Sequence, residues 1–174
     1  MKKLALALSL LLLSSCAAPA KEIAGQVISC ASITSYMNET SIVLDCLDGG
    51  DGAALGGIKG PAIINVWGSW CGPCKQEIPI FRSFYAKTNG KLKLIGVDVE
   101  ESSIKAGRSF VVKNGITWPN LYDGDGRSRK YFGMGVPVTW FIAVDGSVAY
   151  KKIGVLKNEI ELITLTNKYL GVSL

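Results

Sequence analysis

Two cysteines enclose a glycine and a proline in Cys71-Gly72-Pro73-Cys74, directly after an apolar run and before a predicted helix. Cysteine pairs at this spacing serve three kinds of chemistry. They bind metal ions, form structural disulfides, or transfer electrons by thiol–disulfide exchange. The residue types in the rest of the chain favour the third.

A metal site is the weakest of the three interpretations. Zinc sites take four ligands, usually from two cysteine pairs or from one pair and two histidines. This chain has one CxxC pair and no histidine. Haem attachment requires a histidine immediately after the second cysteine, where this chain has Lys75. We therefore expect no metal and no bound cofactor, only a redox-active disulfide between Cys71 and Cys74.

The expected position of Cys71 favours a redox centre. Its sulfur should lie at the N-terminus of a helix, beside unpaired N–H groups and the positive end of the helix dipole. Both stabilise the thiolate, so they lower the pKa of Cys71 and make it the expected nucleophile. Cys74 follows one turn later on the same side, where it can resolve a mixed disulfide.

The stretch VWGSWCGPCKQEIP, Val66–Pro79, resembles the active-site segment of thioredoxin-like proteins. Its continuation to Glu and Pro resembles the extracytoplasmic TlpA/ResA group in particular. The resemblance covers about residues 42–171. It implies a thioredoxin-like α/β fold, with an N-terminal extension and an extra central helix, and it places Trp70 beside the reactive sulfur.

A second motif, GVPVTWFIAVDG, supplies the other half of the resemblance. It implies that Pro137 forms a cis peptide bond and lies against the cysteine pair. It also implies that the backbone of Val136 pairs with an extended substrate segment, in the manner of an added β-strand. Without the resemblance, Pro137 would be a plain proline at a strand edge.

Glu77 has two interpretations. It lies three residues after Cys74, and the family often buries a carboxylate here. A buried carboxyl has a raised pKa and can exchange the proton of the resolving thiol, so Glu77 is a candidate proton relay. Alternatively, it is an exposed acid that favours the helix dipole.

The elements that must position these residues alternate between strand and helix. Apolar runs and turn signals predict five strands, at residues 41–46, 61–67, 91–99, 138–144 and 147–153, and helices at 71–87, 102–114 and 158–171. This order predicts an α/β fold with a central mixed sheet and helices on both faces. The glycine-rich segment 48–60 is predicted to be a surface turn.

The N-terminus reads as an export signal. Lys2 and Lys3 precede an apolar region, Leu4–Leu13, that is too short to span a bilayer. Leu13-Ser14-Ser15-Cys16 resembles the lipobox of bacterial lipoproteins. We therefore expect a signal peptide at residues 1–15, lipidation of Cys16, a tether at 16–27 and the folded domain at 28–174. The alternative is an ordinary signal peptide with Cys16 as a free thiol.

The number of cysteines indicates whether Cys30 and Cys46 form a disulfide. The chain has five cysteines, and four remain if Cys16 carries lipid. With Cys71 and Cys74 paired, Cys30 and Cys46 are left, and export permits a disulfide between them. The alternative is two separate buried thiols.

These patterns favour a membrane-anchored thiol–disulfide oxidoreductase. The formal net charge is +5, without the basic, aromatic-rich clusters of nucleic-acid-binding proteins, so we expect no nucleic-acid partner. The resemblance implies reduction of exported proteins, for example apocytochrome c, with electrons from a CcdA/DsbD-like membrane protein. The alternatives are an oxidant of exported proteins, a thiol peroxidase, and a non-catalytic lipoprotein binding module.

Overall fold

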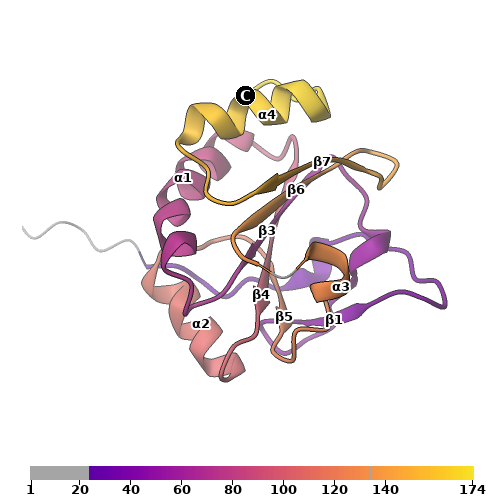
Figure 1. Ribbon diagram of the computed structural model, residues 1–174, viewed down its shortest axis with the longest axis vertical. Coiled ribbons are helices and arrows are strands. Elements are labelled where there is room, and N and C mark those ends of the chain that lie inside the picture. The colour runs from indigo at the N-terminus through magenta and orange to yellow at the C-terminus, as the bar shows by residue number, and fades with distance from the viewer. Residues whose placement is uncertain (1–23, 134) are drawn as a thin grey trace, which may run out of the picture.

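The computed structural model describes residues 24–133 and 135–174 (Figure 1). The expected signal peptide, Cys16 and most of the expected tether lie outside these ranges. Within the two described ranges, none of the helices has the length and apolar character needed to cross a bilayer.

A mixed sheet of seven strands, in the order β2-β1-β5-β4-β3-β6-β7, forms the centre of the fold. β3 pairs in parallel with β4 and antiparallel with β6, and β4 pairs in parallel with β5. The β1–β2, β1–β5 and β6–β7 pairs are antiparallel. The strands span Val43–Cys46 (β1), Ala53–Ala54 (β2), Ala62–Trp67 (β3), Lys93–Val99 (β4), Asn120–Asp123 (β5), Val138–Ile142 (β6) and Val148–Ile153 (β7). The predicted α/β class is confirmed.

The three longer helices cover one face of this sheet. They are α1 (Gly72–Thr88), α2 (Ile104–Lys113) and α4 (Glu159–Leu170), and their apolar side chains share one buried cluster (Figure 1). The short α3 (Arg129–Phe132) and the 3-10 turn Cys30–Ser32 pack on the opposite face, in a second buried cluster. Each side of the sheet is therefore covered, as the alternating pattern predicts.

Side-chain caps begin the three longer helices. The sulfur of Cys71 caps α1, the Ser103 hydroxyl accepts a hydrogen bond from Ala106 N–H at α2, and Asn158 accepts one from Glu161 N–H at α4. Each such cap satisfies a backbone donor that has no partner within the helix. The predicted strands and long helices match the observed ones within two residues at each end.

The prediction of a surface turn at residues 48–60 is wrong for its second half. Ala53 and Ala54 form β2 against β1, and a 3-10 turn follows at Leu55–Gly57. The side chains of Ala53, Ala54, Leu55 and Ile58 are buried. The turn was predicted because the segment contains many glycines, but its short apolar sequence adds a strand to the sheet. β5 was also not predicted.

The last part of the expected tether packs on the domain. Gly25 and Gln26 donate backbone hydrogen bonds to the carbonyl groups of Val112 and Ile116, at 2.7 and 2.9 Å. A Cβ at Gly25 would lie 2.2 Å from the carbonyl oxygen of Val111, so only glycine allows this approach. Residues 25 and 26 of the expected tether are therefore in contact with the end of α2 and the residues that follow it.

Candidate active site

The cysteine pair lies where the central strand β3 passes into α1. β3 is buried along its whole length, and Gly68, Ser69 and Trp70 connect it to the helix. Cys71 and Cys74 form a disulfide and are 4% and 1% exposed. The sulfur of Cys71 accepts the backbone N–H of Cys74 at 3.1 Å. This contact, together with the helix dipole, would stabilise a thiolate on Cys71 once the disulfide is reduced.

The surface next to Cys71 is open. A Cβ placed on Gly72 would meet no atom within 4 Å, and the same holds for Gly133 and Gly135 in the loop before β6. The Trp70 side chain is 54% exposed, and its indole N–H donates to the carbonyl of Val99 at 3.2 Å. Gly133 and Gly135 line the same small cavity as Trp70, so this surface lacks side chains that would obstruct it.

The Val136–Pro137 peptide bond is cis, as the resemblance implied. Pro137 immediately precedes β6, whose first residue, Val138, pairs with Val66 near the end of β3. Val136 and Trp70 line the same small cavity. The structure thus brings these two predicted substrate-binding residues to one surface.

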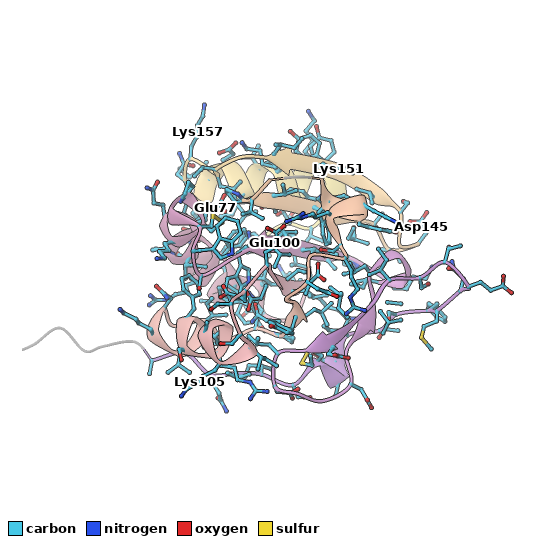
Figure 2. The ribbon with its side chains drawn as sticks, turned by 60° about the horizontal axis from the view of Figure 1, so that its bottom comes forward. Glu77, Glu100, Lys105, Asp145, Lys151 and Lys157 are labelled. Atoms are coloured by element: carbon cyan, nitrogen blue, oxygen red, sulfur yellow. A yellow bond between two sulfur atoms is a disulfide. The ribbon has the colours of Figure 1, made fainter. Side chains whose placement is uncertain are left out.

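Arg129 and Glu100 form an ion pair at the same cavity. The Glu100 side chain, labelled in Figure 2, is about one third exposed. The hydrogen bond from Arg129 lowers the pKa of Glu100. Neither residue was predicted, because they are 29 positions apart in sequence. Together they place paired charges beside an otherwise largely apolar hollow.

Glu77 is fully buried, so the alternative of an exposed acid at the start of the helix is wrong. Its side chain is 0% exposed and its Oε1 atom accepts the backbone N–H of Leu156 at 2.6 Å. Burial raises the pKa of Glu77 from 4.5 to about 7, against the lowering effects of the Leu156 hydrogen bond, Lys152 and Asn65. Its Oε2 atom has no hydrogen-bond partner within the described part of the chain. A carboxyl group with this pKa exchanges protons readily near neutral pH.

Asn65 is a buried polar residue near Glu77 that was not predicted to belong to the site. It interrupts the apolar strand β3, and its amide nitrogen finds no partner within hydrogen-bond distance among the described residues. The amide is nevertheless close enough to lower the pKa of Glu77. The sequence signal for Asn65 is that it is the one polar residue in an otherwise apolar strand.

Two further buried carboxyl groups, those of Asp98 and Glu101, were also not predicted. Glu101 accepts hydrogen bonds from the backbone N–H and the hydroxyl of Ser69, the latter at 2.9 Å, and so holds the segment that leads into Cys71. Asp98 lies on β4 with both oxygens lacking a hydrogen-bond donor among the described residues. Burial and the charge of Glu101 raise the pKa of Asp98 from 3.8 to about 9, so it is protonated at neutral pH.

Gly107 makes room for this carboxyl pair. It lies on α2, where a Cβ would be 1.9 Å from Oδ2 of Asp98. Only glycine allows the helix to pass so close to the carboxyl group. The pair therefore lies between β4, α2 and the loop that precedes Cys71.

The predicted disulfide between Cys30 and Cys46 is confirmed, and the alternative of two separate thiols is wrong. Its residues are 2% and 0% exposed and belong to the buried cluster on the face of the sheet opposite Cys71 and Cys74. The bridge ties the 3-10 turn to β1. Its burial on the far face separates it from exchange at the active site.

Known proteins resemble this chain in sequence and in fold. The AhpC/TSA family matches residues 42–151. Sporulation thiol-disulfide oxidoreductase A of Bacillus subtilis (strain 168) is 33% identical over 101 residues, which are 56% of this chain and 61% of that protein. Thiol-disulfide oxidoreductase ResA of Bacillus thuringiensis (strain Al Hakam) is 33% identical over 100 residues, 56% of this chain and 57% of that protein. The chain therefore spans about three fifths of the length of these two relatives.

The crystal structure of StoA from Bacillus subtilis is similar with a TM-score of 0.59 and 27% sequence identity, over 72% of this chain and 95% of StoA. The resemblance to the TlpA/ResA group, drawn from the cysteine and proline motifs, is confirmed by these similarities. So is the thioredoxin-like fold.

Proposed function

This chain belongs to the AhpC/TSA family, and on that premise we propose that it is a thiol–disulfide oxidoreductase that acts on exported proteins. The observation that carries the proposal is the position of Cys71. Its sulfur lies at the N-terminus of α1, accepts the N–H of Cys74 and borders open space at Gly72. The naming of two relatives as thiol-disulfide oxidoreductases supports it.

In the reducing direction, the Cys71 thiolate attacks one sulfur of a substrate disulfide. A mixed disulfide forms, and the other substrate sulfur leaves as a thiolate. Cys74 then loses its proton and attacks the Cys71 sulfur, which closes the Cys71–Cys74 disulfide and releases the second substrate thiolate. Two electrons pass from the protein to the substrate, and the reaction needs no bound cofactor.

Glu77 receives the proton of Cys74 in the second step. It lies one turn after Cys74 on α1, and burial raises the pKa of Glu77 to about 7. A base with this pKa accepts a proton at neutral pH and returns it in the reverse reaction. Proton transfer between Cys74 and Glu77 can therefore take place in both directions of electron flow.

The substrate lies as an extended segment against the loop before β6. The backbone of Val136 pairs with it, and Trp70 lines the same cavity as Val136. Backbone pairing of this kind reads the shape of an extended chain more than its side chains. The site therefore accepts more than one protein disulfide.

We assign the reducing direction to this protein. Its electrons come from a CcdA/DsbD-like membrane protein, and its substrates are exported thiol proteins such as apocytochrome c. Lipidated Cys16 anchors it on the extracytoplasmic face of the membrane. Support for this setting comes from the sequence of the N-terminus and from the buried Cys30–Cys46 disulfide, since such bridges persist in oxidising compartments.

Reduction of insulin by dithiothreitol tests the activity. The protein should accelerate insulin precipitation, and Cys71→Ser should abolish the acceleration, whereas a Cys30→Ser/Cys46→Ser double variant should retain it. Peroxide consumption measured on the same samples identifies a thiol peroxidase instead. Acceleration that survives in Cys71→Ser would refute the assignment of Cys71 as the nucleophile.

The reduction potential of the Cys71–Cys74 pair tests the direction separately. A potential near that of thioredoxin, about −270 mV, supports a reductant, whereas one near about −120 mV identifies an oxidant of exported proteins. The measurement uses equilibrium with glutathione followed by alkylation of the free thiols.

A further inference from the structure

Lys152 lies on the same face of the sheet as the buried Glu77. It is on β7, directly opposite Thr139 of β6, which in turn pairs with Asn65 of β3. These three residues form one row across the sheet, on the side that α1 covers. Strands alternate their side chains between faces, so the neighbouring Lys151 points to the other side, where its ammonium group lies 4.1 Å from the Trp140 ring centre.

The Lys152 side chain turns back onto its own chain. It is only 19% exposed, and its ammonium group donates to the carbonyl groups of Ile153 and Val155, at 3.4 and 3.1 Å. Lysine usually extends its ammonium group into water. Here the group instead holds the short segment that follows β7.

That segment supplies the hydrogen bond to Glu77. Leu156 directly follows Val155, and its N–H donates to Oε1 of Glu77 at 2.6 Å. The ammonium group of Lys152 therefore fixes the carbonyl of one residue while the next residue binds the carboxyl group. Figure 2 shows Glu77 beside α1 and Lys151 on the β6–β7 hairpin.

Two charged groups from other elements act on Glu77, Lys152 from β7 and Glu161 from α4, and Cys74 precedes it by one turn on α1. Burial raises the pKa of Glu77 most, the Lys152 charge lowers it, and the Glu161 charge raises it. Lys152 and Glu161 are themselves 4.0 Å apart, so each weakens the effect of the other on Glu77.

We propose that Lys152 is a positioning residue for Glu77, which holds the segment that binds the carboxyl group and supplies the positive charge that favours its ionised form. The inference rests on the proposed function, because Glu77 has a proton to accept only if Cys74 takes part in exchange. Lys152 keeps part of the Glu77 population able to accept that proton at neutral pH.

Titration of Glu77 by NMR, through its side-chain carboxyl carbon in the oxidised full-length chain, tests the proposal without any activity assay. In Lys152→Met, the midpoint should rise by about half a pH unit, the size of a partly screened charge interaction. Lys152→Arg should restore most of the wild-type midpoint. Lys151→Met is the matched control, since it removes an adjacent lysine on the other face, and should leave the midpoint unchanged.

Glu161→Gln gives a prediction of opposite sign. It removes the negative charge that raises the pKa of Glu77, and it frees Lys152 from its ion pair, so the midpoint should fall. Glutamine retains an oxygen that can accept the Lys157 N–H now bound by Glu161. A merely structural role for Lys152 would not produce opposite shifts in these two variants.

An unchanged midpoint in Lys152→Met, or an equal shift in Lys151→Met, would overturn the proposal. The pH profile of insulin reduction provides the functional readout, and its acid limb should move with the Glu77 midpoint. If the wild-type chain does not reduce insulin, the proposed function fails, whereas the NMR titration still decides the place of Lys152.

Discussion

Replacement of Glu77 by glutamine should change the pH dependence of stability in one direction and by a predictable amount. The raised pKa means that folding disfavours the ionised carboxylate. Below the unfolded pKa of 4.5, both states are protonated and the cost is absent. As the pH rises from 4.5 to about 7, the unfolded chain loses its proton first and the folded state loses stability.

The size of the effect follows from the shift. The pKa of Glu77 rises from 4.5 to about 7. Since one pKa unit corresponds to about 1.4 kcal/mol, the ionised side chain costs the folded state about 3 kcal/mol above pH 7. Glutamine cannot ionise, and its oxygen can still accept the Leu156 N–H. Glu77→Gln should therefore gain about 3 kcal/mol relative to wild type between pH 4 and pH 8.

Urea unfolding of the oxidised protein across this range measures the difference. The free energy of unfolding of each variant is obtained by linear extrapolation at each pH. Glu39→Gln is the control, since it removes an exposed carboxylate on a turn and should show no comparable trend. If the unfolding free energies of wild type and Glu77→Gln differ by the same amount at pH 4 and pH 8, the claim that burial raises the pKa of Glu77 is refuted.

Three further predictions address other parts of the structure. Loss of the buried bridge in Cys30→Ser/Cys46→Ser should cost about 3 kcal/mol of unfolding free energy in urea, and no loss would contradict a structural role. Asp98→Asn should remove a fall in stability between pH 3.8 and about 9, since burial raises the pKa of Asp98 across that window; an unchanged pH slope in urea would exclude this. Trp70→Ala should lower kcat/KM for insulin about tenfold, the size of one lost apolar contact, but leave the rate with a small aromatic disulfide nearly unchanged; equal losses would assign Trp70 to chemistry instead of substrate binding.

The parts of the fold that the sequence predicted are those set by local patterns. The apolar run before Cys71 specifies a buried strand, and the residues from Cys71 onward specify a helix, each over a short stretch of sequence. Such signals need no knowledge of distant contacts.

The parts that the sequence did not predict depend on distant contacts. Glu77 receives its hydrogen bond from Leu156, 79 positions away, and Ser69 receives its support from Glu101, 32 positions away. Polar residues inside buried strands, such as Asn65 and Asp98, were the available signals. Their partners come from neighbouring strands and helices, which only the folded chain brings together.

The central claim is that the N-terminus of α1 prepares the Cys71 sulfur for attack. Alkylation of the reduced protein with iodoacetamide, followed at Cys71 by mass spectrometry across a pH series, measures the pKa of this thiol directly. We predict a midpoint clearly below that of free cysteine, about 8.5. A midpoint at or above that of free cysteine would contradict the account.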